Sequence, residues 1–329
     1  METADHEVLR TAIDWLTAGE TVYLATVAKT FGSSPRPPGS LAALVASGRF
    51  VGSVSGGCME ADLVARLRDD RLPQKFPALI TYGVTQEEAH RFGLPCGGKL
   101  ELVLERLVST APLKNILEKI DARQLAIRQL CLDTGEANLH PASAHEEFSC
   151  DGKFMRKLFG PGWRLLLIGA GQLSRFVAQM GMALDYEVIV CEPREELASL
   201  WHVDGAIINK SMPDDAVRLL ADMCSAVLAL THDPKLDDMA LLEALESPAF
   251  YVGALGSHAN NDKRRTRLAT LGVTPENLAR LHGPVGLAIG SKTPAEIAVA
   301  VLAGVTAARH GIALEAKPEQ EPAQLQVSG

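Results

Sequence analysis

Long hydrophobic runs are missing from this 329-residue sequence, so it lacks the roughly 20 apolar residues that a membrane-spanning helix requires. The acidic start METADHEVLR has neither the basic nor the apolar block of a signal peptide. The formal net charge of −8 also lacks the positive sign that marks most nucleic-acid-binding domains. We therefore expect a globular protein that does not cross a membrane and does not bind nucleic acid.

Closely spaced cysteine pairs are also missing. The six cysteines stand at positions 58, 96, 131, 150, 191 and 224. No two of them form the C-x-x-C pattern of a structural zinc site, and in a chain of this size six scattered cysteines do not indicate a disulfide framework. Reduced thiols are typical of the cytoplasm, so we expect a cytoplasmic protein.

The length and the change of pattern along the chain predict two α/β domains. Residues 1–158 contain helical and β-branched segments in mixed order, with a less regular part over residues 107–158 that we expect to hold a helix and short strands. Residues 159–314 alternate strand-like and helical segments, which predicts a Rossmann-like, doubly wound parallel sheet. Residues 315–329 form a polar tail that we expect to be disordered.

The second domain opens with WRLLLIGAGQLSRFVAQMGMALDYEVIVCEPREE, a strand, a glycine turn, a helix, a second strand and an acid. Gly169 permits the tight turn of a dinucleotide-binding motif, and Gly171 lets a pyrophosphate approach the helix. Glu192 follows about twenty residues later, where such motifs place the acid that binds a ribose hydroxyl. The pattern predicts the fold, and it leaves open whether a nucleotide or NAD binds or the glycines serve packing alone.

Three further segments end strands of the same predicted sheet, and ligands of such sheets bind at the carboxyl ends of the strands. The candidate ligand-binding residues that they supply are His232, Asp233, Gly253, Gly256, Ser257 and Lys292. The basic run KRRTR after Ser257 indicates either an anion cradle or a solvated helix face. Around Lys292 the spacing does not match a P-loop, and Thr293, Pro294 and Glu296 predict a capping box.

The first domain contains two turns in which a cysteine adjoins a glycine pair. Gly56 and Gly57 precede Cys58 in GSVSGGCMEADLV, where the expected helix would put the thiol beside unpaired amides that favour the thiolate. Cys96 and Gly97 stand in LPCGGKLELV, which continues as a strand. Small glycines allow a bulky ligand to approach, so both thiols are candidate cofactor-binding groups, whereas burial as a small apolar side chain is the alternative.

Arg36 is a third candidate of this domain because the prolines of SSPRPPG hold its loop with little loss of entropy.

Taken together, these segments resemble the xanthine dehydrogenase accessory factor family, the XdhC/CoxI-like proteins. The matching stretches are ATVAKTFGSSPRPPGS, GSVSGGCMEADLV, LPCGGKLELV, LLLIGAGQLSRFVAQMG, VIVCEPREE, LTHDPKLDD, YVGALGSHANNDKRRTRL and LHGPVGLAIGSKTPAEIAVAVLAG. They occur in order over most of the chain. Two positions depart from the family pattern: Glu192 replaces an aspartate, and His258 and Ala259 replace an arginine pair.

The resemblance implies a cytoplasmic accessory factor more than a classical enzyme. Such a factor binds molybdenum cofactor, supports its sulfuration with a cysteine desulfurase, and delivers it to apo xanthine dehydrogenase or a related molybdenum hydroxylase. By analogy with the family we expect a homodimer. Under this hypothesis Cys58 lies at the cofactor and is the candidate ligand of its metal, with Cys96 nearby.

Three other functions stay open from the sequence. An NAD(P)-dependent oxidoreductase would use the Rossmann turn directly, a non-catalytic adaptor would only dock the partner enzymes, and a regulatory ligand could occupy the nucleotide pocket. Binding of the cofactor, weakened by Cys58→Ala or Cys96→Ala, separates the chaperone from these alternatives.

Overall fold

The computed structural model describes residues 3–31, 36–83, 99–142 and 146–312. The chain divides into two compact units, one ending at Pro161 and the other beginning at Gly162. No helix in these residues is long and apolar enough to span a membrane. Each unit is described by itself below.

The first unit contains a five-stranded antiparallel sheet with helices on both faces. Its elements are α1 (Ala4–Thr17), β1 (Val22–Phe31), β2 (Leu41–Val45), β3 (Phe50–Gly52), α2 (Cys58–Arg68), β4 (Ala78–Tyr82), β5 (Lys99–Leu107) and α4 (Ala111–Asp121). The strand order is β3-β2-β1-β5-β4. Strands β2 and β3 form an antiparallel hairpin that turns at Ser47 and Gly48.

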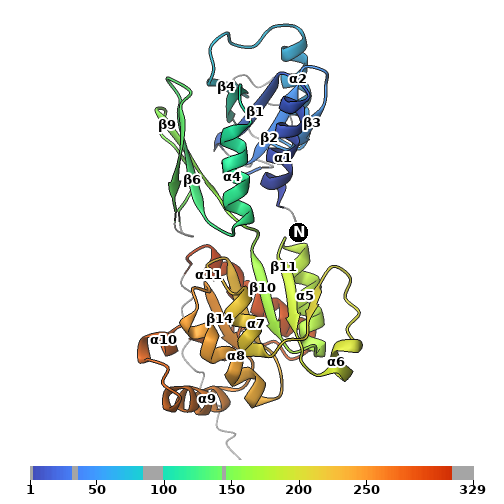
Figure 1. Cartoon of the computed structure of the whole chain (residues 1–329), viewed down its shortest axis with the longest axis vertical. Coiled ribbons are helices and arrows are strands. Elements are labelled where there is room, and N and C mark those ends of the chain that lie inside the picture. Colours follow the sequence, from blue (N-terminus) through green and yellow to red (C-terminus); the bar gives the residue numbers. More distant parts are fainter. Residues whose placement is uncertain (1–2, 32–35, 84–98, 143–145, 313–329) are drawn as a thin grey trace, which may run out of the picture. The chain divides into compact units, whose positions relative to one another are not determined.

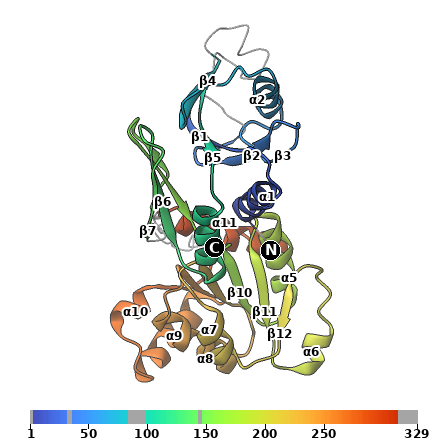
Figure 2. The same cartoon turned by 45° about the horizontal axis from the view of Figure 1, so that its top comes forward.

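Alternation along β2 explains how the sheet is covered. All five residues of LAALV are buried, because successive side chains point to opposite faces. Ala42 and Leu44 pack with Met59 and Leu63 of α2 in one core. The other residues of β2 pack in a second core with α1 and α4. Figure 2 shows α1 and α2 on opposite faces of this sheet.

The segment after α4 is more regular than the sequence predicts. It forms the antiparallel strands β6 (Ala126–Cys131), β7 (Ala137–Pro141), β8 (Ser149–Cys150) and β9 (Phe154–Phe159), in the order β7-β6-β9-β8. A buried ion pair joins this sheet to the first one, because Arg128 on β6 donates to both carboxylate oxygens of Glu105 on β5 at 2.9 and 2.5 Å. The predicted helix and short strands are thus present, and the strands form one sheet.

The second unit is a doubly wound sheet of six parallel strands. Its elements are β10 (Arg164–Ile168), α5 (Gln172–Ala183), β11 (Glu187–Cys191), α6 (Glu195–Ser199), β12 (Ile207–Asn209), α7 (Pro213–Leu220), β13 (Ser225–Ala229), α8 (Pro234–Glu246), β14 (Tyr251–Ala254), α9 (His258–Thr270), α10 (Pro275–Ala279), β15 (Leu281–His282) and α11 (Pro294–Arg309). The strand order β12-β11-β10-β13-β14-β15 is the Rossmann order, which confirms the predicted fold class.

Two separate cores cover the faces of this sheet. Apolar side chains of α5 and α11 pack on one face, and those of α7, α8 and α9 pack on the other. Figure 1 shows α7 and α8 together on one face of the sheet. The order reverses at β10, so the turns after β10 and β13 open onto the same crevice.

Candidate functional site

The turn between β3 and α2 presents a thiol in open space. Gly56 and Gly57 have φ angles of 95° and 127°, a region that favours glycine. A Cβ atom built on either glycine would have no described residue within 4 Å. Cys58, the first residue of α2, is exposed. The glycines are therefore required by the backbone conformation, and they leave room for a ligand beside the thiol.

A buried carboxylate holds this turn in place. Glu60 accepts five hydrogen bonds, three on Oε1 from Ser53 Oγ (3.0 Å), Val54 N (2.7 Å) and Ser55 N (3.0 Å), and two on Oε2 from Ser55 Oγ (2.6 Å) and Gly57 N (2.9 Å). Burial acts to raise the pKa of Glu60. The hydrogen bonds from Ser55 and the backbone lower it by a larger amount, so the pKa lies below its ordinary value. The ionised Glu60 fixes the path of the chain up to Cys58.

The sequence predicts unpaired backbone amides beside the Cys58 thiol, but hydrogen bonds within the turn engage most of them. The amide of Gly57 donates to Glu60, and that of Met59 donates to Ser55 Oγ at 3.1 Å. The amide of Cys58 has no acceptor among the described residues. One backbone donor therefore stays available beside the thiol, and its neighbours are engaged.

Of the other candidate residues of the first domain, the structure describes only Arg36. Arg36 is exposed in the loop between β1 and β2. Cys96 and Gly97 lie outside the described residues, so their predicted roles stay predictions. Within the described ranges there is no group of three or more His, Cys, Asp or Glu side chains that could hold a metal ion.

The glycine turn of the Rossmann unit divides its tasks as the motif predicts. A Cβ on Gly169 would lie 2.6 Å from Thr231 Cγ2, and its φ is 100°, so this position requires glycine for packing and for the turn. A Cβ on Gly171 would meet nothing within 4 Å. The second glycine thus leaves open space at the start of α5, where backbone amides can meet an anion.

Glu192 lies beneath this turn and not in the open space. Its side chain is fully buried and accepts from the Ala170 amide at 3.1 Å. Arg194 donates to both of its carboxylate oxygens, at 2.7 and 2.9 Å. Burial acts to raise the pKa of Glu192. The Arg194 side chain and the backbone amides lower it by a larger amount, so the pKa is below its ordinary value. The group that reaches solvent is the guanidinium of Arg194.

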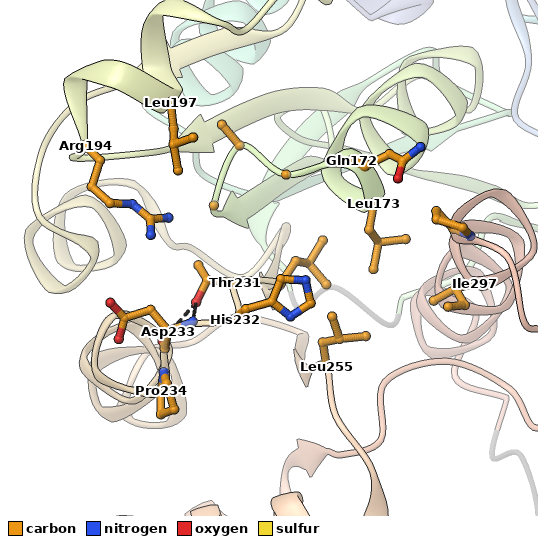
Figure 3. Close-up of a pocket in the computed structure, with 15 residues that line it drawn as sticks. Gln172, Leu173, Arg194, Leu197, Thr231, His232, Asp233, Pro234, Leu255 and Ile297 are labelled. Carbon is orange, nitrogen blue, oxygen red and sulfur yellow. Dashed lines mark hydrogen bonds between the residues drawn. The ribbon is translucent and has the colours of Figure 1, made fainter.

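A cavity of about 620 Å³ lies at the carboxyl ends of β10, β11 and β13. Figure 3 shows Arg194 and Leu197 on one side of it and Thr231, His232 and Asp233 on another. Its walls include the apolar side chains of Leu173, Leu197, Leu230, Leu255 and Ile297. This volume and mixed lining are typical of a small-molecule site.

A second cavity of about 390 Å³ shares four lining residues with the first: Thr231, His232, Pro234 and Leu255. Its floor is a buried network, in which Asp237 accepts from the Thr231 hydroxyl at 2.8 Å and pairs with Arg264 at 3.0 Å. Burial raises the pKa of Asp237 to about 6, although Thr231 and Arg264 act in the opposite direction. The network fixes the chain on both sides of His232, which is exposed.

The remaining candidates of this edge occupy different environments. Gly253 is buried, and a Cβ there would lie 2.5 Å from Val285 Cγ2, so this glycine serves packing. Gly256 lines the second cavity. Ser257 caps α9 by accepting from the Asn260 amide at 3.3 Å. The structure therefore brings His232, Asp233 and Gly256 to the cavities, while Gly253 lies in the core.

The basic run of α9 is mostly engaged in holding the fold. Arg264 is buried against Asp237, Arg265 donates to the carbonyls of Leu278 and Leu281, and Arg267 pairs with Asp238. Arg267 and Lys263 line the second cavity.

The capping box predicted after Lys292 is confirmed. Thr293 caps α11 and accepts from the Glu296 amide, and Glu296 accepts from the Thr293 amide at 2.9 Å. The Lys292 amide also donates to Glu296, at 2.8 Å. These amides are engaged by the protein itself, whereas the Lys292 side chain is exposed.

Two residues of these sites were missed at the level of the sequence, Glu60 and Arg194. Glu60 stands at the third position of α2, where an acid commonly reaches back to the start of a helix, and this was a usable signal. Arg194 follows the strand-end acid by two residues, and its pairing with Glu192 depends on how the chain turns after β11.

Family models match both units. The model described as the XdhC Rossmann domain matches residues 165–305, and that of the XdhC and CoxI family matches residues 15–83. The Escherichia coli protein named molybdenum cofactor insertion chaperone PaoD is 27% identical over 317 residues, which span 93% of this chain and 90% of that protein. A Bacillus subtilis protein whose name describes it as a probable subunit of xanthine dehydrogenase is 26% identical and covers 90% of this chain and 95% of its own.

One solved structure has the same fold over nearly the whole length. The crystal structure of a protein described as a xanthine dehydrogenase from Bacillus halodurans aligns with a TM-score of 0.70 at 23% identity, covering 96% of this chain and 98% of that one. At this identity the likeness supports the fold of the chain.

Proposed function

Because this chain belongs to the XdhC and CoxI family, we propose that it is a maturation chaperone for molybdenum cofactor. It holds the cofactor, supports its sulfuration and delivers it to an apo molybdenum hydroxylase such as xanthine dehydrogenase. The name of the relative PaoD supports binding and insertion of the cofactor, and that of the Bacillus subtilis relative supports the class of client.

The exposed Cys58 in its open turn is the observation that carries this proposal. Thiolates are good ligands for soft transition metals, and this thiol faces solvent beside two glycines that obstruct nothing. Cys58 would contact the metal, Gly56 and Gly57 would admit the cofactor, and Glu60 would keep the turn in shape before the cofactor arrives. The cofactor supplies the molybdenum centre that the client enzyme needs.

The finer parts of the proposal follow from the family resemblance. A cysteine desulfurase provides the sulfur, the chaperone acts as a homodimer in the cytoplasm, and it is an accessory factor more than a classical enzyme. The phosphate groups of the cofactor suit the glycine turns and helix starts of the Rossmann unit, which could also hold a nucleotide.

Reconstitution of apo xanthine dehydrogenase tests the proposal. Cofactor released from a purified molybdenum enzyme is added to the apoenzyme with and without this protein, and the recovered activity is measured. Wild type should raise the recovery, and Cys58→Ser should lower that gain by about tenfold or more. Cys131→Ser is the matched control, because it alters another accessible thiol of the same unit.

Isothermal titration separates the alternative functions. Cofactor binding that Cys58→Ser weakens supports the chaperone. NADH binding with turnover, and no response to the cofactor, would replace it with an oxidoreductase. Binding of the apo-dehydrogenase without any cofactor binding would replace it with a docking adaptor.

A further inference from the structure

Glu192, the acid that follows β11, is enclosed by donors of the protein and does not reach the cavity. Its Oε1 atom accepts from the amide and Nε of Arg194 at 3.1 and 2.7 Å. Its Oε2 atom accepts from the Ala170 amide and from Arg194 Nη2 at 3.1 and 2.9 Å. Each oxygen thus has two donors from the protein itself, and the side chain is fully buried, so no part of it is accessible to a ligand. A ribose hydroxyl therefore has no acceptor at Glu192.

We propose that Arg194 takes over from Glu192 as the group that contacts the ligand of the Rossmann cavity, and that it binds a phosphoryl group there. The group that faces the ligand is then a hydrogen-bond donor in place of an acceptor. In a dinucleotide site the strand-end acid accepts hydrogen bonds from a ribose diol. Here the cavity meets a guanidinium, which only donates, so the ligand must present an acceptor.

The geometry of Arg194 fits this role. Its side chain is 44% exposed, it lines the 620 Å³ cavity, and Figure 3 shows its guanidinium pointing into that space. Nε and Nη2 are held by Glu192, whereas Nη1 has no acceptor among the described residues. Glu192 acts as a positioning residue, because its two bonds fix the plane of the guanidinium. Of the five N–H groups of the guanidinium, two on Nη1 and one on Nη2 remain in this fixed plane to donate to the oxygens of a phosphate.

The rest of the cavity indicates the class of ligand. The open space at Gly171 lets a second phosphate reach the amides that begin the 12-residue helix α5. The apolar walls at Leu173, Leu255 and Ile297 suit a flat ring. The chemistry is that of a ring-bearing compound with two phosphate positions, which a 2′-phosphorylated dinucleotide or a pterin cofactor with a pyrophosphate provides.

The negative charge of Asp233, on the opposite wall of the cavity, would repel a bound anion. Removing this charge should therefore change the affinity for a phosphate in the opposite direction to removing the charge of Arg194. Its carboxylate caps α8 by accepting from the Lys235 amide at 2.9 Å, and its charge acts on Arg194. Asparagine caps helices as well as aspartate does, so Asp233→Asn removes the charge and keeps the cap. If Arg194 binds a phosphoryl group, this variant should tighten binding, whereas loss of the guanidinium should weaken it.

Titration calorimetry of the full chain with NADP⁺, NAD⁺ and inorganic pyrophosphate is the test. NADP⁺ should bind at least tenfold more tightly than NAD⁺. Arg194→Gln should weaken NADP⁺ binding tenfold or more, the double variant Glu192→Gln/Arg194→Gln should do the same without an unpaired buried charge, and Asp233→Asn should tighten it a few-fold. Arg218→Gln is the control, because Arg218 also pairs with carboxylates and does not line the cavity.

Equal or tighter binding of NAD⁺ would overturn the proposal, and so would binding that Arg194→Gln leaves unchanged, or no binding of any probe at millimolar concentration. Competition identifies the source of the phosphate. If released molybdenum cofactor displaces NADP⁺, the cavity holds the cofactor's phosphate, and if it does not, the source is a dinucleotide. Cys58→Ser should leave NADP⁺ binding intact, so this inference and the chaperone function can fail separately.

Discussion

The Cys58 turn and the Gly169 turn are both held by a buried glutamate, which we call the anchor, but they expose different groups, a thiol in the first and a guanidinium in the second. In both, a strand leads through a glycine pair into a helix, and a fully buried glutamate binds backbone amides of the turn. Glu60 has uncharged donors, so its negative charge is not cancelled by a cation. Glu192 has Arg194, whose guanidinium cancels the charge and extends into the cavity.

This difference shows that a buried carboxylate can serve as a scaffold without contacting a ligand. The ligand-facing group is then a neighbour in the sequence, a thiol two residues before Glu60 and a guanidinium two residues after Glu192. In both turns the pKa of the glutamate is lowered because the hydrogen bonds outweigh burial. The four predictions below test whether the two turns really share the anchor and differ in the exposed group.

The largest contrast should be in thiol reactivity. Cys58 is exposed at the first turn, whereas Cys191 is buried just before Glu192, and burial, with the charges of Glu192 and Asp214, raises its pKa to about 12. At pH 8 the thiolate fraction of Cys191 is then on the order of 10⁻⁴. Iodoacetamide followed by peptide mass spectrometry should label Cys58 at least 100-fold faster. Comparable rates in the folded protein would show that the second turn exposes its thiol too.

The two glycines of the Rossmann turn should differ by about 3 kcal/mol in unfolding free energy. Gly169→Ala combines an unfavourable φ with a contact at 2.6 Å, and we expect it to destabilise by ~3 kcal/mol. Gly171 has a φ of −78° and open space, so Gly171→Ala should leave stability unchanged or slightly higher.

Urea denaturation followed by tryptophan fluorescence measures this difference. Trp163 and Trp201 belong to the Rossmann unit, and Trp15→Phe removes the signal of the other unit. Equal midpoints for the two glycine variants would contradict the assigned division of tasks. Gly171→Ala should still weaken binding of a phosphate ligand, because its methyl group enters the open space.

Removing the carboxylate from the first turn should cost about 2 kcal/mol locally. Glu60→Gln has one acceptor oxygen in place of two, so at least one amide or hydroxyl donor loses its partner. Hydrogen exchange of the peptide that covers Val54 to Gly57 should accelerate on the order of tenfold or more. Glu118→Gln on the exposed face of α4 is the control, and exchange that matches this control would mean that Glu60 does not hold the turn.

The smallest expected effect is the pH dependence of stability. A carboxyl whose pKa is lower in the folded state stabilises that state above its unfolded pKa, and this stabilisation is lost as the pH falls through the folded value. Both glutamates have pKa values below 4.5, so the unfolding temperature should fall as the pH drops below about 4.5. Glu60→Gln should make this fall shallower. An unfolding temperature that stays constant from pH 5 to pH 3 would show that the ionised glutamates do not stabilise the two turns.

Much of the fold was predictable because its signals are local. The periodicity from Trp163 onward, the glycine turn and the acid after β11 predict the Rossmann unit, and Thr293 with Glu296 predicts the cap of α11. The four-stranded sheet after α4 was predicted only as short strands, since its pairing joins residues far apart in the sequence. Gly253 was assigned to a binding edge, although its lack of a side chain is required by Val285 of a distant segment.

By itself the sequence determined which residues are small, reactive or charged at each turn, because composition and spacing are properties of the chain. Only the tertiary structure decided where each charged group faces. Glu60 and Glu192 are drawn inward because buried amides and hydroxyls need acceptors, and this leaves Cys58 and Arg194 at the surface. Such a division depends on the three-dimensional balance of donors and acceptors, which spacing along the chain does not contain.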